Sequence, residues 1–182
     1  MEKFRCKWCN LSNPLYVRYH DEEWCVPRAD DGYLFEMLLL ECFQAGLSWE
    51  CVLNKRENFR RAFDEFDINR VCAYDEAKVA ELLSDPGIIR NRQKINAAIC
   101  NAGVFKAIVA EFGSFRAYLE QFFDGKVMYE VGQATNEVSD RISADLKKRG
   151  MKFVGSKIIY AYLQAIGVIY SHEKACFLYK SV

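Results

Sequence analysis

The stretch LFEMLLLECFQAG, residues 34–46, is the most strongly patterned segment of this 182-residue chain. Apolar side chains recur there at i, i+3 and i+4, at Leu34, Met37 and Leu38, which is the spacing of one face of an α-helix. Two aspartates precede the pattern as potential N-terminal caps, and Gly46 ends it. The stretch therefore predicts an amphipathic helix with a defined beginning and end.

Helical periodicity continues through most of the chain. Further helices are expected after the caps Ser48 and Asp75, after Gly87, over residues 114–123, before Gly150 and over residues 156–170. The last segment is rich in Ile, Val and Tyr, but its length and the absence of partner strands favour a helix. Residues 124–136 form the only long loop expected. The predicted fold class is all-α.

The charge pattern excludes a protein that coats nucleic acid by charge alone. Lys and Arg together number 25, as do Asp and Glu, so the net charge is zero. Basic residues nevertheless cluster in three runs, at residues 55–61, 90–94 and 147–152. Each run is typical of a solvated helix face, but three on one side of the fold would form a DNA footprint.

The length and composition predict one domain or two closely packed subdomains. We find no apolar run approaching the roughly 18 residues of a membrane helix, and the first residues are too polar for a secretory signal. Without such a signal, the eight cysteines are expected to be mostly reduced thiols. We expect a cytoplasmic monomer without membrane association.

The two histidines of the chain each lie near cysteines. In SHEKAC, near the C-terminus, His172 and Cys176 are four residues apart, which on a helix places both on one face and suits two ligands of a tetrahedral zinc ion. His20 follows RCKWC, which contains Cys6 and Cys9. A zinc ion could therefore join the two ends of the chain. The spacing leaves open which cysteine of the C-x2-C pair is a ligand, and buried cysteines often bind nothing.

Glu41 is an exception to the amphipathic pattern, because it is a carboxylate on the apolar stripe of residues 34–46. Buried carboxylates are rare unless they are paired or hydrogen-bonded. One interpretation is that Glu41 caps a backbone or meets an arginine. The alternative is a pocket, because aromatic residues lie nearby in the sequence, at Tyr16, Tyr19, Trp24 and Trp49. Aromatic walls around a carboxylate are a good receptor for a flat, cationic ring.

A second exception is SDPGIIRNRQKI, where one predicted helix ends and another begins almost at once around Gly87. A tight turn of this kind can direct backbone N–H groups and a helix N-terminus at a DNA phosphate. Arg90, Arg92 and Lys94 follow where they would reinforce that contact. Any tight turn between helices could also use Pro-Gly, so the alternative is a purely structural turn.

Several motifs together resemble the 3-methyladenine DNA glycosylase I family. They are YHDEEWCVP, LFEMLLLECFQAGLSW, NKRENFRRAF, GIIRNRQKI, LKKRGMKFVG and the closing H-x3-C, and they occur in this order without large gaps. The resemblance implies a helix-hairpin-helix DNA glycosylase fold in which a zinc site joins the N- and C-terminal segments. It implies a repair enzyme that excises 3-methyladenine from alkylated double-stranded DNA and releases the free base.

The resemblance also implies residue roles. By position, the ligands of one structural zinc per chain would be Cys6, His20, His172 and Cys176, which leaves Cys9 outside the site. Glu41 would be the catalytic carboxylate that recognises the base, and Tyr16, Tyr19, Trp24 and Trp49 would form the walls of the pocket. Gly87, Arg90, Arg92 and Lys94 would contact DNA.

The chain is expected to be one glycosylase unit, residues 1–182, with two helical subdomains. Residues of about 1–65 with 150–182 would carry the zinc, and residues of about 66–149 the hairpin. No aspartate occurs between residues 86 and 123, where many helix-hairpin-helix glycosylases place a catalytic one. This absence fits a substrate whose positive charge already weakens the glycosidic bond.

Two departures and two alternatives complete the prediction. Cys25 replaces the usual glycine, which leaves the conformation of the loop after Trp24 open, and Tyr170 and Ser171 replace the usual Asn-Asp before the histidine. One alternative is a helical DNA-binding module with zinc but no glycosylase activity, which would need an altered pocket residue. The other is a thiol-redox or metal-handling protein built on CKWC, which would leave the aromatic and carboxylate residues unexplained.

Overall fold

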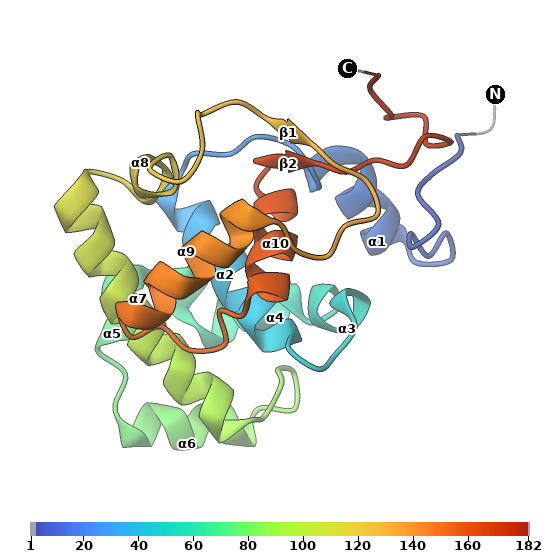
Figure 1. Ribbon diagram of the computed structural model, residues 1–182. Helices are drawn as coiled ribbons and strands as arrows, with labels where there is room; N and C mark the ends of the chain where they lie inside the picture. Colours follow the sequence, from blue (N-terminus) through green and yellow to red (C-terminus); the bar gives the residue numbers. More distant parts are fainter. Residues whose placement is uncertain (1–2, 182) are drawn as a thin grey trace.

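A computed structural model describes residues 3–181, so residues 1, 2 and 182 of the predicted unit lie outside it. Within that range the chain is mostly helical, with one short pair of strands (Figure 1). The α-helices are α1 (Pro14–Arg18), α2 (Asp31–Gln44), α3 (Trp49–Leu53), α4 (Arg56–Ala62), α5 (Ile68–Cys72), α6 (Glu76–Ser84), α7 (Arg92–Phe112), α8 (Phe115–Leu119), α9 (Glu137–Lys148) and α10 (Ser156–Ala165). A π-helical turn (Tyr19–Glu23), a 3-10 turn (Asp64–Phe66) and the strands β1 (Met128–Tyr129) and β2 (Ile169–Tyr170) complete the elements. The all-α prediction is confirmed.

Helix α2 forms the centre of the fold. Asp30 caps it by accepting a hydrogen bond from the Tyr33 N–H, as the sequence predicted. Every residue from Leu34 to Phe43 is buried, because α7, α8 and α10 pack around the helix. A helix buried on all sides carries apolar residues all around it rather than on one stripe. The predicted amphipathic helix is therefore more completely buried than its pattern indicated.

The other predicted caps are found, but some helices are shorter than expected. Ser48 caps α3 and Asp75 caps α6 through hydrogen bonds that their side-chain oxygens accept from backbone N–H groups three residues ahead. The segment after Ser48 divides into α3 and α4, and α8 covers only half of residues 114–123. These short helices fold around the core instead of continuing along one axis.

The prediction of one helix over residues 156–170 is wrong at its end. Helix α10 stops at Ala165, and Gly167, with φ of +72°, turns the chain into β2, which pairs in parallel with β1. A Cβ atom on Gly167 would collide with the backbone nitrogen of Pro27, so this close approach requires glycine. The partner strand lies within the predicted loop, which is why it was missed.

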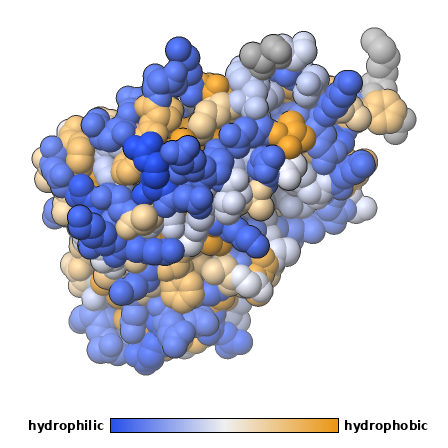
Figure 2. All heavy atoms as spheres, in the orientation of Figure 1, coloured by the Kyte–Doolittle hydropathy of each residue, from blue (hydrophilic) through white to orange (hydrophobic). Residues whose placement is uncertain are grey.

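Helix α7 has 21 residues and a window of mean hydropathy 1.3, so by length and composition it could cross a membrane. Polar and charged residues such as Asn101 and Lys106 interrupt this helix, so it does not contain the uninterrupted apolar run that the sequence was expected to lack. A core helix of a globular fold passes the same test, and α7 buries Ile95, Ala98, Ala102 and Phe105 against its neighbours. Figure 2 shows hydrophilic residues over most of the face in view, with apolar residues in small groups.

The two ends of the described chain lie side by side (Figure 1). The Phe177 N–H donates a hydrogen bond of 2.8 Å to the Phe4 carbonyl oxygen. This contact places the segment around Cys6 next to the segment around Cys176. Residues far apart in the sequence therefore meet at one side of the molecule.

Candidate functional site

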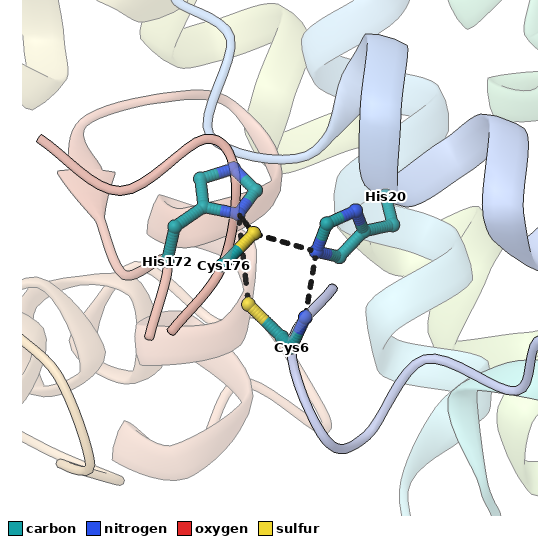
Figure 3. A group of neighbouring side chains, drawn as sticks. All are labelled: Cys6, His20, His172 and Cys176. Atoms are coloured by element: carbon teal, nitrogen blue, oxygen red, sulfur yellow. Dashed lines mark hydrogen bonds between the residues drawn. The ribbon is translucent and has the colours of Figure 1, made fainter. Parts of the chain in front are cut away.

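Four buried side chains converge where the two ends meet (Figure 3). One ligand atom from each of Cys6, His20, His172 and Cys176 lies within 4.8 Å of all the others. The Sγ atoms of Cys6 and Cys176 lie 3.6 and 3.5 Å from His172 Nδ1, and Cys176 Sγ lies 3.6 Å from His20 Nε2. These residues can hold a metal ion.

The spacing of the cluster fits tetrahedral zinc. Zn–S bonds of about 2.3 Å and Zn–N bonds of about 2.0–2.1 Å place a sulfur and a nitrogen ligand about 3.5 Å apart. The structure therefore brings together the four residues predicted from the sequence. Cys9 lies outside the cluster, and its Sγ is 3.9 Å from the Tyr16 carbonyl oxygen.

The segment that contains His172 and Cys176 is not helical. These residues lie in a turn, closed by a hydrogen bond of 2.8 Å from the Cys176 N–H to the Glu173 carbonyl oxygen. The i, i+4 spacing was thus correct for the pair, but the helix assumed for it was wrong. A turn brings the two side chains together just as closely.

The histidines are held in the form that binds a metal. His20 Nδ1 lies 2.8 Å from the Asp21 carboxylate, which Arg5 binds with two further hydrogen bonds, so His20 Nε2 is left to face the cluster. Burial lowers the pKa of His20, and burial lowers the pKa of His172 to about 4. Both rings are therefore neutral at pH 7, as metal ligation requires.

A cavity of about 180 Å³ lies beside this cluster. Its lining is mostly aromatic with a few polar groups, and consists of Trp8, Tyr16, Tyr19, Trp24, Glu41, Gln44, Trp49, Ala161 and Gln164. All five residues predicted for the pocket are present. The cavity is smaller than the roughly 300–1,000 Å³ typical of drug-sized ligands, which suits one flat ring system.

Glu41 is buried in this cavity without a partner. Its side chain is 3% exposed, and within residues 3–181 no group donates a hydrogen bond to its buried Oε2. Burial raises the pKa of its carboxyl to about 8. The interpretation that Glu41 meets an arginine is wrong, because the buried Arg56 pairs with Glu36 and Glu23 instead.

The indole N–H of Trp49 is also buried without an acceptor in the described part of the chain. Buried polar atoms are nearly always hydrogen-bonded, so each exception needs an explanation. Here an acceptor on Glu41 and a donor on Trp49 line one cavity. This arrangement can bind a flat molecule with polar groups at its edge.

The aromatic side chains of the lining form two groups of rings in contact. The rings of Tyr19 and Trp49 have centroids 5.2 Å apart, and Trp8 lies 5.2 Å from Tyr16 and 4.7 Å from Trp24. Trp8 was not predicted, although it lies between the two cysteines of CKWC. The other unpredicted lining residue with a sequence signal is Gln164, the polar exception in an apolar helix.

The turn around Gly87 is closed by the protein's own groups. The Gly87 N–H donates to Asp85 Oδ1 at 2.7 Å, and its carbonyl oxygen accepts from Lys55 and Asn58 at 3.3 and 3.2 Å. The Gly87 N–H is therefore engaged before any anion arrives. The contacts with Lys55 also bring the first two basic runs of the sequence next to each other.

The three basic residues after the turn differ in their surroundings. Lys94 is buried, and its Nζ donates to the Phe43 and Ala45 carbonyl oxygens at 2.9 and 2.7 Å. This geometry contradicts the prediction that Lys94 contacts DNA, because its ammonium group closes the C-terminal end of α2. Arg92 pairs at the surface with Glu76, and Arg90 is exposed.

Comparison with known proteins gives consistent matches over nearly the whole chain. Residues 8–179 match the methyladenine glycosylase family. A DNA-3-methyladenine glycosylase 1 from Escherichia coli (strain K12) is 43% identical over 182 residues, with 96% of each chain covered. A crystal structure of a 3-methyladenine DNA glycosylase I superposes with a TM-score of 0.93 at 43% identity and covers 97% of this chain and 100% of that one. A variant of a 3-methyladenine DNA glycosylase I in complex with 3-methyladenine has a TM-score of 0.88 at 29% identity, with coverages of 94% and 97%.

Proposed function

This chain belongs to the methyladenine glycosylase family, and we propose on that basis that it is a DNA-repair glycosylase that excises 3-methyladenine from alkylated DNA. The observation that carries the proposal is the buried, unpartnered carboxyl of Glu41 in a cavity with aromatic walls. A family match alone would also fit a protein that kept the fold and lost the activity. An intact pocket favours the enzyme.

The chemistry needs little from the protein. The enzyme extrudes the damaged nucleotide, at a cost of a few kcal/mol of unstacking that is smallest for a damaged base. Methylation at N3 gives the base a positive charge, so the glycosidic bond is already weak. Water then attacks the sugar carbon as an oxocarbenium-like ion forms, the base leaves with the bonding electrons as the neutral free base, and the attacking water releases a proton to solvent.

The cavity residues would recognise the cationic base. The walls formed by Tyr16, Tyr19 and Trp49 would contribute roughly 0.5–2 kcal/mol of cation–π attraction. Glu41 would accept hydrogen bonds from the exocyclic amine and from a ring nitrogen that carries a proton. A cation beside the carboxyl lowers its pKa, so binding would be coupled to release of a proton from Glu41.

We propose that the cluster of two cysteines and two histidines binds one zinc ion per chain. The ion when bound would supply a structural cross-link between the ends of the chain. The residues that would hold it are Cys6, His20, His172 and Cys176, whose spacing fits tetrahedral geometry. They are separate from the cavity lining, so the ion would not contact the base.

DNA contacts are proposed for the exposed arginines after the Gly87 turn. Arg90 has no ion-pair partner in the described chain, and the pair between Arg92 and Glu76 is exposed, so it is weak enough to be exchanged for a phosphate. Gly87 would shape the turn rather than donate its N–H. The division into two subdomains, the monomeric state and the cytoplasmic location also remain predictions.

A second surface could take part in DNA binding. Helices α9 and α10 pack together, and the third basic run, residues 147–152, covers the end of α9 and the start of the connection to α10. Helix α10 begins at this connection without a side-chain cap, and it reaches the cavity with Ala161 and Gln164. The two surfaces are distinguished by single substitutions.

The proposed function is tested by incubating the purified protein with methylated double-stranded DNA and measuring released bases by chromatography. Release of 3-methyladenine above the spontaneous rate is expected. DNA binding without release would favour the alternative of a binding module. Redox activity that depends on Cys6 and Cys9 would favour the thiol-redox alternative, which the position of Cys6 in the cluster with two histidines already disfavours.

A further inference from the structure

Gln164 lines the same cavity as Glu41 but belongs to α10. Its Nε2 donates a hydrogen bond of 2.7 Å to Ser171 Oγ, and Ser171 Oγ in turn donates to the Glu130 carbonyl oxygen. A hydroxyl group has a single proton to donate. Because that proton is used for Glu130, Ser171 can only accept from Gln164, so the amide of Gln164 must turn its NH2 group to Ser171.

The Glu130 carbonyl oxygen, which accepts the hydrogen bond from Ser171, is itself fixed in place. The Glu130 N–H donates to the Tyr170 carbonyl oxygen at 3.1 Å, which extends the pairing of β1 with β2. The Glu130 carboxylate accepts a hydrogen bond of 3.0 Å from the Tyr160 hydroxyl of α10. Ser171 is 5% exposed and its N–H contacts Cys25 Sγ at 3.3 Å. The two hydrogen bonds that join Gln164, Ser171 and Glu130 therefore end on the backbone of the strand pair rather than on a mobile side chain.

The orientation of the amide determines what Gln164 offers to a ligand. With Nε2 turned to Ser171, the polar atom that remains is the carbonyl oxygen Oε1. Nothing within residues 3–181 donates a hydrogen bond to Oε1. Gln164 therefore adds an acceptor, Oε1, to a lining that already includes the Glu41 carboxyl, and the two residues come from different helices.

Adenine and guanine differ at ring position 6, where the Glu41 carboxyl and Gln164 Oε1 would accept hydrogen bonds from a bound base. Adenine has an N6 amino group with two hydrogens to donate, whereas guanine has the acceptor O6. We propose that Gln164, oriented by Ser171, is a specificity-determining residue that accepts the second N6 hydrogen and thereby selects 3-methyladenine over 3-methylguanine. This proposal rests on the proposed glycosylase function.

The physical reason is that a site built to accept hydrogen bonds rejects a base that also presents an acceptor. Facing O6, Gln164 Oε1 would be left without a hydrogen bond and would repel the guanine oxygen. If the amide could rotate, it would present NH2 instead and would bind O6. The role of Ser171 is to prevent that rotation, so Ser171 acts as a positioning residue.

The test compares release of both bases from methylated DNA by the wild-type protein and by Gln164→Leu, Ser171→Ala and Gln121→Leu. Gln121 is exposed on the surface and serves as a matched control. For Gln164→Leu we expect the release rate of 3-methyladenine to fall about two- to tenfold, the value of one hydrogen bond, with little loss for 3-methylguanine. Ser171→Ala should change the same ratio by a smaller factor, and Gln121→Leu should leave it unchanged.

Two further measurements separate the outcomes. Binding of free 3-methyladenine, followed by tryptophan fluorescence, shows whether each variant still forms the cavity, and zinc content shows whether Ser171→Ala disturbs the neighbouring His172. An unchanged ratio of the two release rates, or equal losses for both bases, would overturn the proposed role of Gln164. If the wild-type protein released neither base, the proposed function itself would fail.

Discussion

The indole of Trp24 packs edge-on against the imidazole of His172, with ring centroids 4.8 Å apart and an interplanar angle of 80°. Trp24 lines the cavity, whereas His172 belongs to the Cys/His cluster. Trp8 makes a similar link, with its ring 5.2 Å from His20. One wall of the cavity therefore rests on the residues proposed to bind zinc, and the two sites should respond together when the cluster is disturbed.

We expect the purified protein to contain one zinc ion per chain, and Cys6→Ala to destabilise it strongly. The free energy that binds a structural zinc also stabilises the fold, so loss of a ligand should lower the melting temperature by about 10 °C or more. Affinity for free 3-methyladenine should fall as well, because the wall at Trp24 loses its support. Elemental analysis, thermal melting and fluorescence titration check these results.

Cys9→Ala is the matched control for the metal prediction. Cys9 is buried like Cys6 and belongs to the same C-x2-C pair, but its Sγ lies outside the cluster. We expect the Cys9→Ala variant to retain zinc. Its free energy of unfolding should fall by only about 1 kcal/mol, the usual effect of a point substitution. Equal stability of the two variants, or protein free of zinc when purified without chelator, would contradict the assignment.

The substitution Glu41→Gln tests base recognition. It keeps the shape of the side chain but replaces one acceptor oxygen by a donor amide, so a charge-assisted hydrogen bond of about 1.5–3 kcal/mol is lost. Release of 3-methyladenine should fall at least about tenfold, which corresponds to about 1.4 kcal/mol. Zinc content should be unchanged. Full activity with a lowered melting temperature would instead make Glu41 a structural residue.

The raised pKa of Glu41 predicts how stability depends on pH. The carboxyl titrates at about 8 in the folded protein, against its ordinary value of 4.5. Below pH 4.5 both the folded and the unfolded states are protonated, so Glu41 costs nothing. As pH rises toward 8 only the unfolded state ionises, and the free energy of unfolding falls by up to about 1.4 kcal/mol per pH unit.

The comparison with Glu41→Gln isolates this effect, since all other groups titrate alike in both proteins. Urea denaturation at pH 5 and pH 8 should show the variant gaining stability relative to the wild type as pH rises. A difference that is independent of pH would mean that Glu41 ionises normally in the folded state.

Much of this fold follows from local sequence rules, and so does part of the site. Caps such as Asp30 and Ser48 act on backbone N–H groups a few residues away, so their effect is readable from spacing. Glu41 was noticed because a carboxylate on an apolar stripe is costly to bury. The partners of the site residues cannot be predicted from local spacing. The contact of Trp24 with His172, for example, depends on how the two ends of the chain meet.

Lys94 shows most clearly what local rules miss. Its position after two arginines predicted a phosphate contact, but in the structure its ammonium group binds the carbonyl oxygens of Phe43 and Ala45. Those partners lie about fifty residues away in the sequence, and only the packing of α7 on α2 brings them together. The β1–β2 pair was missed for the same reason, because its strands have two residues each and no local pattern.

The exposed Arg90 is expected to bind a DNA phosphate. Arg90→Ala should weaken binding of double-stranded DNA, and the slope of log affinity against log salt should become shallower by about 0.9 for each phosphate that the variant no longer neutralises. Lys152→Ala, at an exposed lysine of the third basic run, tests the second surface in the same assay. Arg70→Ala, an exposed arginine on α5, is the control. An unchanged slope for Arg90→Ala would remove Arg90 from the DNA-binding surface.

Cys25 provides a test of backbone conformation in the loop after Trp24. Its φ of +65° lies in the left-handed region, which favours the glycine that the family usually has there, so the loop keeps the glycine conformation with a cysteine in place. Cys25→Gly and Cys25→Ala both remove the Sγ that contacts the Ser171 N–H. The difference in stability between the two variants therefore depends on the backbone conformation at residue 25 and not on the lost Sγ contact.

At an ordinary helical position glycine is less stable than alanine by about 1 kcal/mol, and Cys51 in α3 offers such a position as a control. At Cys25 we expect the order to reverse, with Cys25→Gly more stable than Cys25→Ala by about 1 kcal/mol, because alanine keeps the strain of a positive φ. Chemical denaturation of the four variants gives both differences. If alanine were the more stable residue at both positions, Cys25 could not have the left-handed conformation. The loop after Trp24 would then need another backbone conformation to make the hydrogen bond of 3.0 Å from the Cys25 N–H to the Gln164 carbonyl oxygen.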